Sequence, residues 1–259
     1  MDWTKAKTIL IIALIVTDIF LIATYGGKNG EKEFGNEEAL IAILESSNIY
    51  VDAEKIPEKH RNMPALAVEY RSVSQDEIDA LIESTEIEAV DDSDEAYTEA
   101  AEDFVSCLGM MSEYISGAHV VRTSKEKEDD DSENGGGSES SGEDVKVVFG
   151  CEADGTKLDG SYIICTFEGR KVSGFNSYWL EPGEFSARKQ ETISAAVALI
   201  TYMSEREGRE EVHISDIELV YWVNSASYDS MAAVTDTALP TWRITFENGE
   251  TVHIEAFER

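Results

Sequence analysis

The chain has little positive charge, and this shortage limits the partners that it can bind. Of its 259 residues, 53 are acidic and 21 are basic, so the formal net charge is −32. A surface of this charge repels phosphate backbones and anionic polymers. We therefore expect no nucleic-acid binding and no polyanion binding, and we expect the acidity to serve mostly solubility and a linker.

Cysteines are also scarce. Cys107, Cys151 and Cys165 are odd in number and irregularly spaced, so they predict neither a disulfide framework nor a CxxC metal site. A bridge between Cys151 and Cys165 is conceivable outside the cell. Because small buried thiols are common, we expect these two cysteines to be unpaired.

The motifs of catalysis are missing as well. The sequence contains no glycine-rich phosphate loop, GxSxG elbow, HExxH motif or zinc-spaced Cys/His cluster. The four histidines are scattered, at His60, His119, His213 and His253, and the last two are expected to be ordinary strand residues. We predict a non-enzymatic protein with no catalytic residue, no cofactor and no metal site.

Long hydrophobic runs are limited to one, at residues 8–25. A helix of about 18 residues rises roughly 27 Å, which nearly matches a hydrocarbon core of about 30 Å. Lys5 and Lys7 precede the run, and the positive-inside rule places them in the cytoplasm. We predict a cytoplasmic tail at residues 1–7, a transmembrane helix at 8–25, a tether at 26–35, and the bulk of the chain outside the cell membrane.

A cleaved secretory signal is the alternative interpretation of this N-terminus, since both begin with basic residues and an apolar segment. The end of the run, Ile-Ala-Thr-Tyr-Gly-Gly at residues 22–27, lacks a small-x-small cleavage site. The apolar run is also long for a signal peptide. We therefore favour a retained anchor.

Asp18 is the one charged residue within the apolar run. A carboxylate near the centre of a membrane helix costs about 2.5–3.5 kcal/mol on insertion scales, so we expect Asp18 to face another protein or to be protonated. With its neighbours Thr17 and Phe20 it forms the predicted partner-contact site. The alternative is that Asp18 lies close enough to the outer interface to reach water.

The remaining chain is predicted to form two lobes, at residues 36–123 and 145–259, separated by residues 124–144. That acidic Gly/Ser segment contains no apolar residue and cannot offset its ordering entropy, so we predict a linker or a long disordered loop. Expected helices cover residues 37–46, 74–82 with a capping box at Ser74, 95–110 and 186–205. Expected strands cover residues 65–70, 114–122, 145–150, 161–167, 171–180, 217–223, 231–234, 241–247 and 250–257.

Two further expectations concern individual side chains. In the helix at 186–205, the residues Ile193, Val197, Ile200 and Met203 are expected to face inward. The last two strands are expected to pair through a three-residue loop at 247–249, because only that register buries both of their apolar sets together.

Aromatic residues occur side by side at two places. Trp179 and Trp222, with Tyr178 and Tyr221 beside them, could line a binding surface or belong to the core.

The opening Met-Asp-Trp-x-Lys-x-Lys-Thr-Ile at residues 1–9, followed by the apolar run, resembles the start of the YycI family. This family comprises membrane-anchored regulatory proteins of the YycG/WalK sensor kinase system of low-GC Gram-positive bacteria. The similarity continues at residues 44–57, 74–81 and 186–203, and in the run Pro-Thr-Trp-Arg-Ile at 240–244. Residues 86–122 and the acidic segment are not part of the resemblance.

The resemblance implies an α+β fold, with a single transmembrane helix followed by two extracellular lobes in which a helix packs on an antiparallel sheet. It also implies regulation of a YycG/WalK-like sensor histidine kinase that controls cell-wall metabolism, through contacts among transmembrane helices and together with a YycH-like partner. Two other classes stay open: an extracellular module that binds a wall fragment or peptide, and an exported inhibitor or enzyme.

Overall fold

The computed structural model describes residue 17 and residues 37–84, 87–124, 143–224 and 235–257. It confirms a mixed α+β fold with a large, mainly antiparallel sheet, whose strands follow the hydrogen-bonded order β1-β7-β8-β2-β6-β5-β4-β3, with β9 paired to β8. The chain divides into two compact units. Within the described residues we find no helix that is both long enough and apolar enough to span a membrane.

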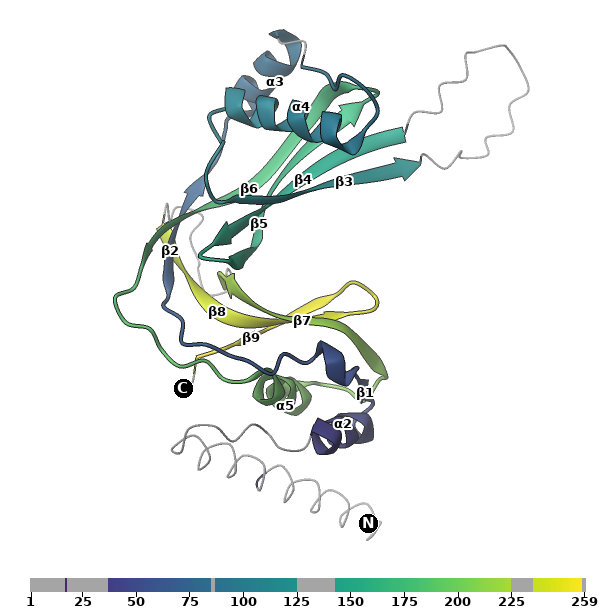
Figure 1. The fold of residues 1–259 in the computed structure, drawn as a ribbon, viewed down its shortest axis with the longest axis vertical. Helices are drawn as coiled ribbons and strands as arrows, with labels where there is room; N and C mark the ends of the chain where they lie inside the picture. The colour runs from purple at the N-terminus through teal and green to yellow at the C-terminus, as the bar shows by residue number, and fades with distance from the viewer. Residues whose placement is uncertain (1–16, 18–36, 85–86, 125–142, 225–234, 258–259) are drawn as a thin grey trace, which may run out of the picture. The chain divides into compact units, whose positions relative to one another are not determined.

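Unit 2 comprises Met63–Gln190 and Leu219–Thr241. Its sheet contains β2 (Leu66–Arg71), β3 (Ile115–Ser124), β4 (Glu143–Ala153), β5 (Thr156–Glu168) and β6 (Lys171–Phe185). The helices α3 (Gln75–Ser84) and α4 (Asp94–Cys107) lie on one side of these strands (Figure 1). Alternate residues of β4 and β5 are buried towards α4, as the period of two in a strand requires.

Unit 1 is described by residues 37–62, 191–218 and 242–257. It contains α2 (Glu37–Ser46), β1 (Ile49–Tyr50), a 3₁₀ turn η1 (Ala53–Lys55), α5 (Ala195–Glu205) and β9 (Thr251–Glu255). Two long strands, β7 (Val212–Trp222) and β8 (Thr235–Phe246), contribute residues to both units. The indole N–H of Trp242 on β8, buried in the core of unit 1, donates to the Ile193 carbonyl at 2.9 Å.

The division of the chain differs from the two consecutive lobes that the sequence predicts. The strands β3 and β4, on either side of the acidic segment, pair with each other, with Ser124 opposite Glu143. Both ends of the predicted linker therefore belong to strands of one unit, and residues 125–142 of it lie outside the described residues. Each unit is instead assembled from separate stretches of the chain, because strand pairing here joins residues far apart in the sequence.

The helix predicted at 186–205 begins later than expected, and the prediction of its inward face is wrong. Ser194 caps α5 by accepting from the Val197 N–H at 3.4 Å, and residues before it are held in extended bridges. The fully buried residues are Ala195, Ala198 and Leu199, whereas the four predicted inward residues are only half-buried. Because alanine side chains are small, this face of α5 can pack closely on its neighbours. The four larger residues that the sequence predicts to face inward would hold the helix further away.

The register predicted for the last two strands is confirmed by the turn between them. Phe246 N–H donates to the Glu250 carbonyl at 2.9 Å, which leaves the three-residue loop 247–249. Gly249 has a φ of +83°, the left-handed conformation that glycine adopts without strain. Ile244 and Ile254 are consequently both buried.

We predict that replacing residues 125–142 with Asn-Gly leaves the fold intact and makes it more stable. Because Ser124 is paired with Glu143, a two-residue type I′ turn closes this hairpin. A shorter loop costs less entropy to close. We expect this to raise the free energy of unfolding by roughly 1–2 kcal/mol. Thermal unfolding of the full chain should show a midpoint raised by a few degrees, and a lower midpoint would show that the segment packs on the fold.

The corrected face of α5 gives a second prediction. Leu199→Ala should lower the free energy of unfolding by about 2–5 kcal/mol, because Leu199 is fully buried. The control, Met203→Ala on the half-buried side of the same helix, should lower it much less. Urea denaturation of both variants compares the two positions, and an equal loss would restore the face predicted from the sequence.

Candidate functional site

The predicted partner-contact site lies almost entirely outside the described residues. Thr17 is helical and exposed, whereas Asp18 and Phe20 are not described. The described residues contain a second candidate site, a hollow of about 430 Å³ in unit 2 between α3 and α4.

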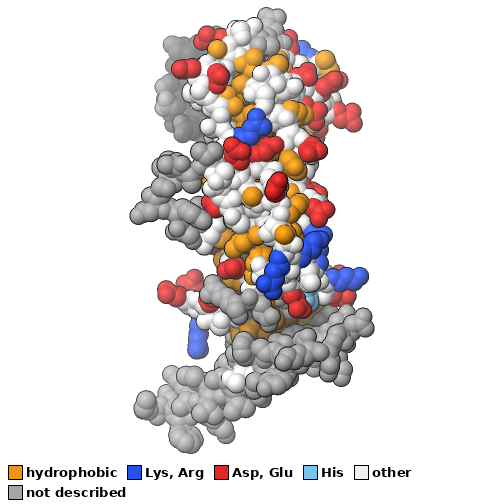
Figure 2. Space-filling model, turned by 90° about the vertical axis from the view of Figure 1, so that its left-hand side faces the viewer, with side chains coloured by type: hydrophobic (Ala, Val, Ile, Leu, Met, Phe, Trp, Pro, Cys, Tyr) orange, Lys and Arg blue, Asp and Glu red, His pale blue; other side chains and the backbone are white. Residues whose placement is uncertain are grey.

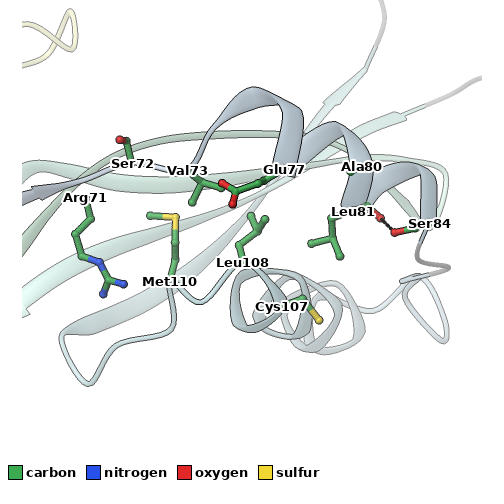
Figure 3. Close-up of a pocket in the computed structure, with 10 residues that line it drawn as sticks. All are labelled: Arg71, Ser72, Val73, Glu77, Ala80, Leu81, Ser84, Cys107, Leu108 and Met110. Carbon is green, nitrogen blue, oxygen red and sulfur yellow. Dashed lines mark hydrogen bonds between the residues drawn. The ribbon is translucent and has the colours of Figure 1, made fainter.

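Apolar and polar side chains both line this hollow (Figure 3). Leu81 of α3 and Leu108, just after α4, point into the space between the two helices, and Met110 closes it towards β2. The other lining residues are Arg71, Ser72, Val73, Glu77, Ala80, Ser84 and Cys107. Sequence analysis did not single out this set, because its members come from three separate stretches of the chain.

Local capping motifs place these side chains. Ser74 and Glu77 form the predicted capping box: the Ser74 N–H donates to Glu77 Oε2 at 3.2 Å, and the Glu77 N–H donates to Ser74 Oγ at 3.3 Å. At the end of α4, Gly109 has a φ of +65°, and the Met110 N–H donates to the Val105 carbonyl at 3.0 Å. This Schellman motif ends the helix at Cys107, three residues earlier than predicted.

A polar network fixes the chain that leaves α4. Arg71 donates to the Gly109 carbonyl at 3.1 Å and lies 3.7 Å from the Glu181 carboxylate. Glu181 also accepts hydrogen bonds from Ser112 Oγ at 3.0 Å and from the Trp179 indole at 2.6 Å. With its donors directed at these acceptors, Arg71 serves chiefly to hold this wall of the hollow in place.

The hollow does not assemble a catalytic group. Hydrogen bonds from the hydroxyl and N–H of Ser74 lower the pKa of Glu77, so its carboxyl group stays ionised rather than acting as a proton donor. The exposed thiol of Cys107 has no histidine beside it among the lining residues. A mixed apolar and polar lining without such a group suits binding rather than a reaction.

The other two cysteines are buried and unpaired in β4 and β5. Cys165 lies opposite Val147, four residues along β4 from Cys151, or about 13 Å at the rise of a strand. A disulfide cannot span that distance. Burial raises the pKa of both the Cys151 and the Cys165 thiols to about 12.

The singled-out histidines and aromatic residues are distributed over core and surface. His213 and His253 lie in β7 and β9, as predicted, and His213 stacks on Tyr50 with ring centroids 5.0 Å apart. Among the described residues, no group of three potential metal ligands occurs. Of the aromatic residues, Trp179 and Tyr221 belong to the core, whereas Tyr178 is 39% exposed on β6.

The comparison with protein families decides the identification. The family model of the YycI protein matches residues 31–257, most of the chain. The chain belongs to the YycI family. The YycI family is a regulatory family associated with the YycG/WalK two-component system. The match begins after the opening at residues 1–9 and includes residues 86–122, which the sequence resemblance did not cover. No curated protein matches the chain.

Thiol labelling tests the state of the three cysteines. Because the thiolate is the reactive form, thiols with a pKa of about 12 are almost unreactive near pH 8. We expect a maleimide to label the folded chain once, at Cys107, and the unfolded chain three times. Mass spectrometry counts the labels, and Cys107→Ser should abolish native labelling. Rapid labelling of Cys151 or Cys165, or a disulfide between them, would contradict the structure.

Proposed function

We propose that this YycI-family protein is a non-enzymatic, membrane-anchored regulator of a YycG/WalK-like sensor histidine kinase that controls cell-wall metabolism. In this proposal it acts through contacts of its transmembrane helix, together with a YycH-like partner. The N-terminus is cytoplasmic, the helix spans residues 8–25, and the bulk of the chain is extracellular.

The observation that carries the proposal is the family match over residues 31–257, taken together with Asp18 in the apolar run. In hydrocarbon, where water is scarce, a polar side chain is stabilised by a partner group that hydrogen-bonds to it. A lone carboxyl in the membrane segment of a regulator is therefore best explained by a second helix that supplies a polar group opposite Asp18.

The chemistry of the described residues is in keeping with a binding role. The hollow between α3 and α4 lacks a paired nucleophile and base. The strongly negative surface is unsuited to nucleic acid, and Figure 2 shows acidic side chains spread along the side of the molecule that it draws. A regulator needs neither catalysis nor a cofactor.

Substitution of Asp18 tests the proposed membrane contact. Asp18→Leu should preserve membrane insertion, and favour it by a few kcal/mol on insertion scales, while weakening association with the kinase or the YycH-like protein. Ile19→Leu is the matched control and should leave association unchanged, because at about 100° per residue Ile19 points away from Asp18, Thr17 and Phe20. Co-purification from membranes measures association, and a reporter of the kinase's target genes measures regulation.

Two results would contradict the proposal. The first is recovery from membranes of a mature chain that starts near Gly26, which would show that the N-terminal segment is a cleaved signal. The second is unchanged regulation after residues 1–25 are replaced by an unrelated anchor, which would place the function in the extracellular residues.

A further inference from the structure

The sheet of unit 2 has a second face, opposite α3 and α4, which we call the open face. Strand pairing arranges it as three rows across β3, β4, β5 and β6. The first row is Ser116, Gly150, Tyr162 and Tyr178. The second row is His119, Val148, Ile164 and Asn176. The third row is Val121, Lys146, Thr166 and Gly174. None of these twelve residues is buried.

The open face contains no acidic residue, although 53 of the 259 residues of the chain are Asp or Glu. At that frequency, two or three carboxylates would be expected among twelve exposed or half-buried positions. Acidic residues return directly beyond the rows, at Glu152 on one end and at Asp144 and Glu168 on the other. The only Lys or Arg of the face is Lys146, in the third row, so the first two rows carry neither a carboxylate nor a Lys or Arg. Depletion of charge from part of an exposed patch is typical of a surface that is covered by a ligand or partner.

Tyrosines dominate one end of this face. Tyr162 and Tyr178 lie opposite each other on β5 and β6, with ring centroids 6.4 Å apart and planes tilted by 33°. Tyr70 of β2 adjoins them: the Tyr178 hydroxyl donates to the Tyr70 hydroxyl, which donates to Asp236, both at 3.4 Å. The result is a platform of aromatic rings with hydroxyl groups and one carboxylate along its side.

Two glycines keep the platform flat. Gly150 lies opposite Tyr162, and Gly174 lies two rows away on β6. Neither has a positive φ, and an added Cβ would meet its nearest neighbours at ordinary contact distances of 3.6 Å and 3.5 Å respectively. The backbone therefore does not require glycine at either position. Glycine weakens a strand interior, and such a glycine often marks the close approach of a ligand.

We propose that the open face binds an uncharged oligosaccharide, whose sugar rings stack on Tyr162 and Tyr178 and pass over Gly150. A pyranose ring has an apolar face that packs on an aromatic ring and hydroxyl groups at its edge that hydrogen-bond to side chains such as Tyr70, Asp236 and Asn176. Exposed strand faces of other folds bind oligosaccharides in this way. The net charge of −32 disfavours an anionic chain.

The size of the face favours a glycan over a protein. Four strands and three rows cover about 19 Å by 20 Å, or roughly 400 Å². A stable protein interface needs about 800 Å² from each partner. The inference does not depend on the regulatory role proposed above, because that role is placed in the membrane helix.

The test uses the full chain in phospholipid nanodiscs, which contain no sugar, titrated with chitohexaose and with cellohexaose by calorimetry. The wild-type chain should bind at least one of them saturably and should not bind heparin. Tyr178→Ala should weaken binding by about tenfold or more, whereas Tyr178→Phe, which keeps the ring, should stay within about threefold.

A steric variant and a tyrosine of the other unit complete the test. Gly150→Thr adds a side chain beside Tyr162 and should therefore weaken binding about tenfold or more. Because strands favour threonine, the variant should not lower the thermal midpoint. Tyr50→Ala in unit 1 is the matched control and should leave binding unchanged. Circular dichroism and thermal unfolding show that each variant is folded.

Three results would overturn the inference. The first is no saturable binding of either uncharged oligosaccharide by the wild-type chain. The second is equal affinity in the wild type, Tyr178→Ala and Gly150→Thr. The third is a self-associated chain in sedimentation experiments that Tyr178→Ala converts to monomers, which would assign the open face to a second copy.

Discussion

The burial of alternate residues of β4, β5 and β6 beneath α4 is the constraint on which unit 2 depends. Val147, Cys165 and Phe167 are fully buried on that face, and the Tyr97 ring of α4 meets Phe167 edge-on at 5.1 Å between centroids. Because side chains alternate along a strand, a slip of one residue would exchange the two faces completely. The same register therefore fixes the core and selects the residues of the open face.

Local features of the sequence are sufficient to predict much of this architecture. The capping box at Ser74 and the loop before Glu250 involve residues within a few positions of each other, and both are found as expected. The beginning of α5 depends instead on distant residues. Met63 bridges Gln190, and Thr192 bridges Phe257, so the chain before Ser194 is extended although its composition permits a helix.

The division of the chain into two units could not be predicted from the sequence, for the same reason. A change in composition at residues 124–144 indicates a boundary only when the chain on each side folds separately, and here the flanking strands pair with each other. The parallel pairing of Ile49 with Val212 and the antiparallel pairing of Leu66 with Ala238 join residues more than a hundred positions apart. The members of the hollow were missed similarly, since residues as far apart in the sequence as Arg71 and Met110 line it together.

The proposed membrane contact and the open face both depart from the rule that side chains match their surroundings. Asp18 is a carboxyl group in an apolar run, and the open face is a carboxylate-free, tyrosine-bearing area on a protein with a net charge of −32. Each departure costs free energy in the isolated chain, in the first case by desolvation and in the second by exposed aromatic surface. The hollow between α3 and α4 shows no such mismatch, because its lining mixes apolar and polar side chains and because Glu77 and Arg71 already have partners. A binding partner removes the desolvation cost at Asp18 and the cost of exposed aromatic surface on the open face, whereas the hollow has no such cost. Asp18 and the open face are therefore the stronger candidates for recognition.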